Sequence, residues 1–425
     1  MKSTSETCFC IVDHGLFLSV ARRLAKSAKR VLYHTPWEKG FSTLNDFIIG
    51  DGFENVELCE DIWKVKKEVD CFVFPDIQHS GLQLELESQG FAVWGSRNGD
   101  SLELNREKFN RVLKQLGLPV APFVVVNGLT ELRKHLWDKT DKYIKISKYR
   151  GTMETWHWRD KTLDSGRLDA LAVKLGPFQD HMPFLVVDAI DCEIEVGGDT
   201  YCVDGYWPSM MLCGLENKDR CYLAEVKNRE EMPQELVDII EAFSPQMNKL
   251  RYRNQWSMET RDGRFIDPTC RGGLPSTASQ LNTWENFPEI VLAGANGKCL
   301  DPIPKFKFSS EAILSLNGKK DDWGKIVIPP ELSESVQLAS CCEIDGAICF
   351  PPDGHEGEDV GWLVAGGETM EEAIEELNRL ADLLPDGLTA ATVDLIELVR
   401  NMRKAEDAGN EVSSEAIPEP ETVVS

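Results

Sequence analysis

Short apolar runs alternate with longer amphipathic segments over the first hundred residues of the chain. The runs CFCIVD (8–13) and DCFVFPD (70–76) are strand-like, while residues 16–34 and 80–96 each begin with the apolar spacing of a helix and end in a further short strand. Strands and helices in alternation are typical of a parallel sheet with helices packed on it. The pattern therefore predicts a small parallel α/β layer.

The central part of the chain changes to longer strands and hairpins. Residues 105–116 have helical spacing and are followed by a glycine and a proline that suit a helix end. Strands are expected at 142–147 and within 182–207, and Asp262-Gly263 predicts a hairpin turn. Residues 361–384 have the pattern of a strand, a glycine turn and an amphipathic helix. The fold class expected is a mixture of α/β and α+β.

Shifts in composition and pattern suggest how the chain divides. We expect an N-terminal α/β domain, a central domain, a small C-terminal α+β domain and a disordered acidic tail, at residues 1–104, 105–300, 301–404 and 405–425 respectively. The tail is expected to be disordered because it is acidic, contains proline and is poor in aromatic residues.

Charge and cysteine content narrow the class of protein. The net charge of −25, from 46 basic and 71 acidic residues, works against nonspecific binding to nucleic acid. No apolar run approaches the roughly 18–20 residues of a membrane span, and the start of the chain does not have the pattern of a secretory signal. Thirteen cysteines without metal-site spacing suggest reduced thiols. We expect a cytoplasmic protein without nucleic-acid or membrane partners.

Lys145 is the first candidate for chemistry. It lies inside the strand YIKIS with isoleucine on either side, and the loop that follows adds Lys148, Arg150 and Gly151. One interpretation is an edge-strand lysine with its ammonium in water. The other is a cation that the sheet directs at a phosphate oxygen, with the loop closing over the phosphates.

Two acids on the predicted hairpin form the second candidate. The turn at Asp262-Gly263 folds the strand of Glu259 back onto the strand of Asp267. Two carboxylates close together raise each other's pKa unless a cation lies between them, and Mg²⁺ commonly takes one or two carboxylates plus phosphate oxygens. Arg271 follows and could stabilise transferring charge. The alternative is a surface hairpin with unrelated acids.

In their order, these segments resemble the ATP-grasp superfamily, and within it the phosphoribosylamine–glycine ligases. The most specific stretch is residues 81–126, with a strand ending in Gly95-Ser96, a helix containing Glu107-Lys108, and the exit GLPVAP. The resemblance implies a pre-ATP-grasp domain, a split ATP-grasp domain and a C-terminal α+β domain. It also implies an ATP-dependent ligase that uses Mg²⁺ or Mn²⁺, acts on a small carboxylate and a small amine, and often forms a homodimer.

The resemblance also implies roles for individual residues. Lys108, Lys145 and Lys148 would contact ATP phosphates. Backbone groups of Val186 and Val187 would meet the adenine, Asp188 would hold the ribose, and Glu193 matches a family glutamate. The implied metal ligands are Glu259, Asp267 and Thr269, and the implied catalytic residue is Arg271.

The chain departs from the family pattern at three places. Asp267 replaces a glutamate and Thr269 an asparagine, the loop after Lys145 has one glycine, and the N-terminal glycine-rich phosphate loop is missing. Phosphoribosylamine is therefore a poor candidate substrate. Two other functions stay open: an ATP-grasp protein that binds nucleotide or a partner without turnover, and a noncatalytic α/β scaffold.

Overall fold

The computed structural model describes residues 2–35, 49–147, 154–192, 195–218, 220–318, 322–352, 359–407 and 413–419. The chain divides into two compact units. The larger unit contains Met1–Asn98, Val196–Met258 and Thr269–Ser425, and the smaller contains Gly99–Glu195 and Glu259–Pro268. The boundaries expected near residues 104, 300 and 404 remain a prediction.

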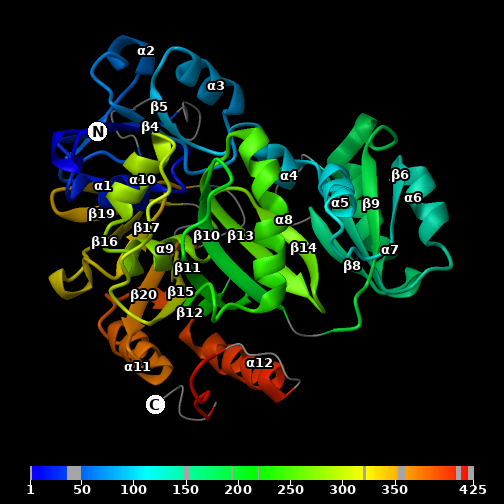
Figure 1. Ribbon diagram of the computed structural model, residues 1–425. Helices are drawn as coiled ribbons and strands as arrows, with labels where there is room; N and C mark the ends of the chain where they lie inside the picture. Colours follow the sequence, from blue (N-terminus) through cyan, green and yellow to red (C-terminus); the bar gives the residue numbers. More distant parts are fainter. Residues whose placement is uncertain are drawn as a thin grey trace. The chain divides into compact units, whose positions relative to one another are not determined.

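The N-terminal part of the larger unit is the predicted parallel layer (Figure 1). Its strands run in the order β3-β2-β1-β4-β5, and each neighbouring pair is parallel. Alternation of short apolar runs with helices therefore gave the layer correctly. The elements are β1 (Cys8–Val12), α1 (Leu18–Ala25), β2 (Arg30–His34), β3 (Val56–Leu58), α2 (Ile62–Val65), β4 (Cys71–Val73), α3 (Ser80–Ser88) and β5 (Ala92–Trp94).

The smaller unit has a sheet of its own with the order β6-β9-β7-β8. Side chains of α6 and α7, among them Leu132 and Leu168, pack with Ile144 and Phe184 of the sheet in one apolar core. The elements are α4 (Asp100–Leu104), α5 (Arg106–Gln115), β6 (Phe123–Asn127), α6 (Leu129–Leu136), β7 (Lys142–Ile146), β8 (Thr155–Trp158), α7 (Lys161–Leu175) and β9 (Pro183–Asp188). The helix predicted over 105–116 is α5, and its N-cap is Asn105.

A second, mostly antiparallel sheet has the order β14-β13-β10-β11-β12-β15-β20-β17, with β21 paired to β15. Its strands are β10 (Val196–Val203), β11 (Met210–Asn217), β12 (Cys221–Asn228), β13 (Arg253–Arg261), β14 (Arg264–Thr269), β15 (Phe308–Leu316), β17 (Val336–Leu338), β20 (Asp359–Gly367) and β21 (Leu388–Ala390). The strands β16 (Gly324–Ile326), β18 (Cys342–Ile344) and β19 (Ala347–Phe350) form a separate small sheet. Asp262 and Gly263 both have positive φ in the hairpin turn that the sequence predicted.

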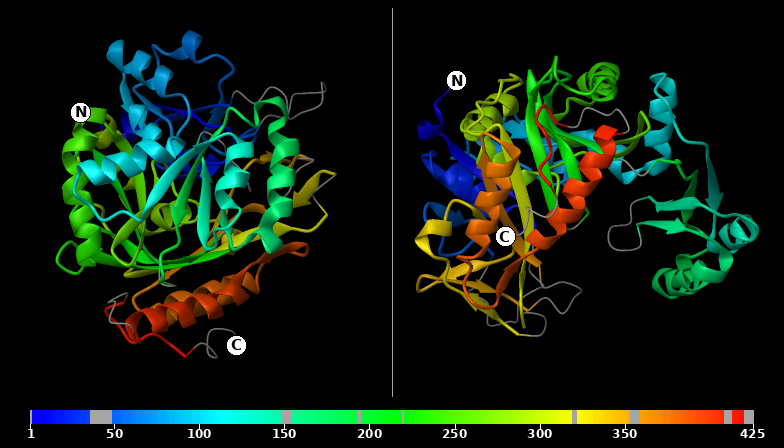
Figure 2. Two further views of the ribbon diagram at one scale, coloured as in Figure 1. Left: turned by 90° about the vertical axis from the view of Figure 1, so that its right-hand side faces the viewer. Right: turned by 90° about the horizontal axis from the view of Figure 1, so that it is seen from below.

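Helices cover both faces of this sheet in the larger unit. They are α8 (Gln234–Leu250), α9 (Thr277–Thr283), α11 (Met370–Ala381) and α12 (Leu395–Asp407), whereas α10 (Phe287–Ala295) packs on β4 and β5 of the parallel layer. Ser310 of β15 donates to the carbonyl of Ala373 in α11, whereas Glu311 next to it accepts from Ser279 in α9. Since neighbouring strand residues point to opposite faces, α9 and α11 lie on opposite sides of β15. Figure 2 shows α12 along the sheet, where it packs on β11 and β12.

The end of the chain contacts the body of the larger unit. Ser414 donates through its backbone nitrogen to Glu225 at 2.8 Å, and Glu415 lies 3.0 Å from Lys307. The expected tail from residue 405 thus begins within α12 and includes hydrogen-bonded residues.

Cysteine pairing and membrane crossing can be checked directly. All thirteen cysteines are free thiols, and most are buried. Over the described ranges, no helix has the length and apolar character needed to cross a membrane.

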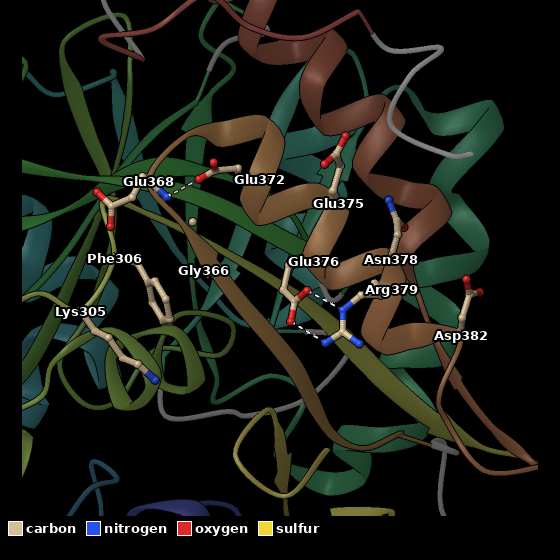
Figure 3. Close-up of a pocket in the computed structure, with 11 residues that line it drawn as sticks. Lys305, Phe306, Gly366, Glu368, Glu372, Glu375, Glu376, Asn378, Arg379 and Asp382 are labelled. Atoms are coloured by element: carbon tan, nitrogen blue, oxygen red, sulfur yellow. Dashed lines mark hydrogen bonds and ion pairs between the residues drawn. The ribbon is translucent and has the colours of Figure 1, made fainter. Parts of the chain in front are cut away.

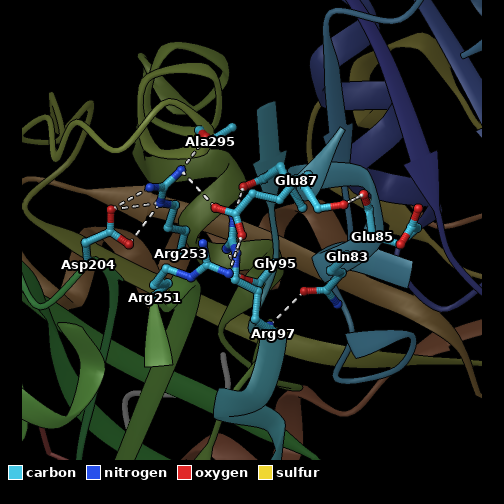
Figure 4. A network of polar contacts seen from close by, with 11 residues as sticks. Gln83, Glu85, Glu87, Gly95, Arg97, Asp204, Arg251, Arg253 and Ala295 are labelled. Carbon is cyan, nitrogen blue, oxygen red and sulfur yellow. Dashed lines mark hydrogen bonds and ion pairs between the residues drawn. The ribbon is translucent and has the colours of Figure 1, made fainter. Parts of the chain in front are cut away.

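Glu87 of α3 lies among three arginines and connects the parallel layer to β13 of the second sheet within the larger unit (Figure 4). Arg97 is fully buried and its Nε lies 3.1 Å from the Glu87 carboxylate. Glu87 is also 3.2 Å from Arg251, and Arg253 pairs with Asp204 at 2.6 Å. Two further N–H groups of Arg97 donate to main-chain carbonyls. Because arginine stays charged in proteins, the buried Arg97 depends on these acceptors.

Removing the acid from this network is expected to destabilise the larger unit. Glu87→Gln leaves the buried Arg97 guanidinium without a neutralising charge, so we expect a loss of about 3 kcal/mol in the free energy of unfolding. Urea denaturation would measure it. Glu85→Gln on the same helix is the control, because Glu85 is exposed and should change stability by less than about 0.5 kcal/mol. Equal effects of both variants would contradict the assigned role of Glu87.

Candidate active site

Lys145 and Asp267 lie together in the smaller unit. The Lys145 ammonium is 3.6 Å from the Asp267 carboxylate and donates at 2.9 Å to the carbonyl of Ile266. Both side chains are mostly buried. The inside-facing lysine of β7 is therefore directed at the hairpin that carries the predicted metal ligand, rather than at open solvent.

Arg106 completes this cluster, and the sequence interpretation missed it. Its guanidinium pairs with Asp267 and lies 3.5 Å from Glu154, and its side chain is 7% exposed. Burial disfavours its charge, but the neighbouring acids Asp267, Glu103 and Glu154 outweigh burial and raise the pKa of Arg106. The cluster thus holds two cations, Arg106 and Lys145, around one mostly buried acid.

The position of Arg106 follows from the start of α5. The Asn105 side chain caps the helix by accepting from the nitrogen of Lys108 at 2.9 Å, and Arg106 is the first helical residue. Phe109 packs edge-on against Phe265 of β14 with ring centroids 4.9 Å apart, which holds α5 on the hairpin. A cation in the first helical turn opposes the helix dipole. That local conflict was the available signal for a functional arginine.

Other predicted phosphate and nucleotide contacts are placed differently. The Lys108 ammonium donates to Ser101 at 2.6 Å, and Asp188 forms an ion pair with Lys142 at 2.8 Å. Val186 and Val187 lie in β9 between β6 and β7 and are paired to both strands. A strand therefore lies on either side of these two valines, and their contact with adenine stays a prediction. Lys148 and Glu193 lie outside the described residues.

The predicted metal ligands are divided between the two units. Glu259 and Asp267 belong to the smaller unit, on the two strands of the hairpin, whereas Thr269 belongs to the larger. Within the described residues, no group of three or more histidine, cysteine, aspartate or glutamate side chains is arranged to hold a metal ion. A metal at Asp267 would also compete with Arg106 for the same carboxylate.

Arg271, the predicted catalytic residue, lies in the larger unit close to the parallel layer. Its Nε is 3.5 Å from Asp76, and its NH1 donates at 2.9 Å to the carbonyl of Gly272. A side chain at Gly272 would come within 2.6 Å of Phe17, and one at Gly273 within 2.5 Å of Ser276. The two glycines after Arg271 are therefore required by close packing.

Histidines that looked uninformative in the sequence gather beside Asp76. His14 follows β1 and His79 precedes α3, and their Nε2 atoms are 2.8 Å apart with the rings nearly parallel. Burial lowers the pKa of both imidazoles. An Nε2–Nε2 hydrogen bond needs one N–H and one lone pair, so the pair accepts at most one proton there.

The histidine pair and Asp76 lie where open α/β sheets commonly bind ligands. The chain order of the parallel strands reverses between β1 and β4, and ligands of open α/β sheets bind outside the carboxyl ends of strands at such a reversal. Asp13, directly after β1, is buried, and burial raises its pKa to about 6. Polar residues directly after two apolar runs, in IVDH and FVFPD, were the sequence signal for this cluster.

A large hollow over α11 does not suit a nucleotide. It has a volume of about 740 Å³, and Figure 3 shows acidic side chains of α11 around it. Glu372 caps its own helix, accepting from the nitrogen of Glu368 at 2.9 Å, and Glu376 pairs with Arg379 at 2.7 Å. A polyanion would meet mostly like charge there.

Comparison with known proteins bears on this geometry. No family model and no curated protein sequence matches the chain. Solved structures do match. Phosphoribosylamine–glycine ligase from Thermotoga maritima superimposes with a TM-score of 0.68 at 17% identity, over 90% of this chain and 98% of that one.

Two further structures match over similar lengths. The biotin carboxylase domain of 2-oxoglutarate carboxylase from Hydrogenobacter thermophilus gives a TM-score of 0.67 at 12% identity, over 97% of this chain and 100% of that one. L-amino acid ligase from Bacillus licheniformis gives 0.61 at 13%, over 91% and 99%. The chain has the ATP-grasp fold. The fold expected from residues 81–126 is thereby confirmed.

The pair of His14 and His79 should make the stability of the chain depend on pH. The folded-state pKa values lie below the ordinary value of about 6.5, so the unfolded chain binds more protons and stability falls as pH decreases through about 6.5. Between about pH 7.5 and pH 5.5, the free energy of unfolding of the wild type should fall by on the order of 1 kcal/mol more than that of His79→Asn, which lacks the pair. Asparagine tolerates the left-handed backbone of His79.

Chemical denaturation at the two pH values measures this difference. His181→Asn serves as the control because His181 is exposed and lies outside the pair. A wild-type pH dependence equal to that of His79→Asn would show that the pair does not titrate in this range.

Proposed function

We propose that the protein is an ATP-dependent carboxylate–amine ligase that forms an amide through an acyl phosphate. The observation that carries the proposal is the pairing of Asp267 with both Lys145 and Arg106 in a chain with the ATP-grasp fold. In this reaction a carboxylate oxygen takes the γ-phosphoryl group of ATP and ADP leaves. The amine then attacks the acyl carbon, and phosphate and a proton are released.

Positioning and charge neutralisation are the main demands of phosphoryl transfer. We assign Lys145 and Arg106 to phosphate oxygens, with Lys108 and Lys148 as further candidates and Asp188 and Glu193 as candidates for the ribose side. Arg271 would stabilise the charge that develops on the transferred group. The local cations supply what the net charge of −25 does not.

Mg²⁺ or Mn²⁺ would be held by Asp267 with Glu259 and Thr269. Mg²⁺ needs only one or two protein carboxylates when phosphates supply other ligands, so the hairpin acids are sufficient in number. The metal would neutralise phosphate charge. The Arg106–Asp267 pair must open for it, because one carboxylate oxygen is already engaged by the guanidinium.

The ion pair between Arg106 and Asp267 favours a second candidate function. If Arg106 keeps Asp267, the site retains cations for phosphate but lacks a complete metal ligand set, as in a protein that binds nucleotide without turnover. The substitution of threonine at position 269 for the family's asparagine points the same way.

The substrates are a small acid and a small amine, and phosphoribosylamine is disfavoured because the glycine-rich N-terminal loop is missing. We propose a homodimer and a cytoplasmic location. The domain division at residues 104, 300 and 404 is proposed on the same resemblance.

Nucleotide binding is the first test. ATP at about 100 times its Kd should add about 2.7 kcal/mol of stability, which a thermal-shift titration with and without Mg²⁺ detects. Lack of any shift with ATP would exclude both the ligase and the binder. A shift that does not depend on Mg²⁺, without ADP release across a panel of acids and amines, would favour the binder.

Variants locate the site within the smaller unit. Lys145→Ala and Asp267→Asn should each abolish ADP formation, and Arg106→Gln should weaken ATP binding by about 10-fold or more, because a charge-assisted hydrogen bond is lost. Arg111→Gln, five residues further along α5 and exposed, is the matched control. Wild-type ADP formation in Lys145→Ala or Asp267→Asn would rule out this assignment.

A further inference from the structure

A small cavity in the larger unit lies apart from the residues assigned so far. It has a volume of about 180 Å³ and is lined by Arg220, Leu274, Pro275, Glu311, Ile313 and Trp362. A cavity of about 150 Å³ can hold a molecule the size of benzene. The space therefore suits a compound of about six to eight non-hydrogen atoms.

Glu311 is the acidic group in the wall of this cavity. It is 1% exposed, and its Oε2 accepts from the nitrogen of Ser276 at 3.3 Å and from the nitrogen and hydroxyl of Ser279 at 3.0 and 2.9 Å. Its other oxygen, Oε1, is buried and has no hydrogen-bond donor among the described residues. One carboxylate oxygen is thus held by α9 and the preceding loop, and the other is left to accept from a ligand.

A buried carboxylate oxygen without a hydrogen-bond donor lowers the stability of the fold. Burial raises the pKa of Glu311 to about 7, although hydrogen bonds from Ser276 and Ser279 favour its charged form. A buried charge is normally compensated by a partner of opposite sign. A ligand ammonium group would provide both the missing donor and the compensating charge.

The other walls indicate the rest of the ligand. Ile313 and Trp362 are directly paired across β15 and β20 and, with Leu274, give apolar surface. Arg220 is exposed at the rim, and the nitrogen of Ile313 donates to its carbonyl at 2.8 Å, which fixes its backbone beside the cavity. A single carboxylate oxygen within apolar walls is a poor metal site. The Glu311 carboxylate, the apolar wall and the Arg220 guanidinium instead match the two charges and the carbon atoms of a zwitterion.

We propose that this cavity binds a small aliphatic amino acid. Its ammonium group donates to Oε1 of Glu311, its carbon atoms lie against Ile313 and Trp362, and its carboxylate meets the guanidinium of Arg220. The evidence for this site is separate from that for the nucleotide site, so binding is expected without ATP and does not depend on the proposed ligase activity.

Calorimetric titration of the full chain without nucleotide tests the proposal. L-alanine or β-alanine should bind with a Kd of about 10 mM or lower, which is the range of weak small-ligand affinities. Propionate lacks the ammonium group and should bind at least about 10-fold more weakly, as should ethylamine, which lacks the carboxylate. No binding of glycine, L-alanine, β-alanine or L-valine, or equal binding of propionate, would overturn the proposal.

Variants separate binding from folding. Glu311→Gln has the same shape and retains an acceptor for Ser279, and it should weaken binding by about 10-fold to 100-fold. Arg220→Gln at the exposed rim should weaken it by about 5-fold to 10-fold and provides the test if Glu311→Gln does not fold. Arg229→Gln is the matched control, because Arg229 pairs with Glu241 and does not line the cavity. Unchanged binding in both Glu311→Gln and Arg220→Gln would overturn the proposal.

Discussion

A buried guanidinium is the constraint on which both units of the chain depend. Arginine cannot release its proton in a protein, so wherever it is buried the fold must supply acids and carbonyls around it. Arg97 has Glu87 and two main-chain carbonyls in the larger unit, and Arg106 has Asp267 and Glu154 in the smaller. Glu87 also lies 3.9 Å from Arg253 of β13 and so connects the parallel layer to the second sheet. In the smaller unit, Asp267 and Glu154 hold Arg106, the side chain that the proposed reaction needs at the phosphates.

Asp267 is consequently under two demands. As a partner of Arg106 and Lys145 it neutralises cations and keeps α5 and β7 directed at the hairpin. As a metal ligand it would have to turn from Arg106, leaving that guanidinium for phosphate. Nucleotide phosphates bring negative charge to the same place, so they could replace Asp267 as the partner of Arg106 and release the carboxylate for a metal. Whether this exchange takes place separates a ligase from a binder more directly than the residue at position 269 does.

Sequence patterns predicted the elements better than the contacts between them. The parallel layer, the helix over 105–116 and the turn at Asp262-Gly263 follow from local apolar spacing and turn chemistry, which are written in neighbouring residues. Arg106 was missed because its partner Asp267 is remote in the chain, and a first-turn arginine looks like a solvated one. Local sequence also does not show that β9 lies between β6 and β7, with Val186 and Val187 paired on both sides.

The buried acids of the chain differ in how their charge is balanced, and that difference separates structural from ligand-directed groups. Asp267 has two cations beside it, whereas Asp13 and Glu311 form no ion pair among the described residues, and burial raises their pKa values to about 6 and about 7. Each of the latter two also has one oxygen without a donor among the described residues. Folding alone gains nothing from an unpaired carboxylate oxygen that a neutral side chain could replace. For Glu311 this agrees with the proposed amino-acid ligand, whose ammonium group would supply the donor that Oε1 lacks.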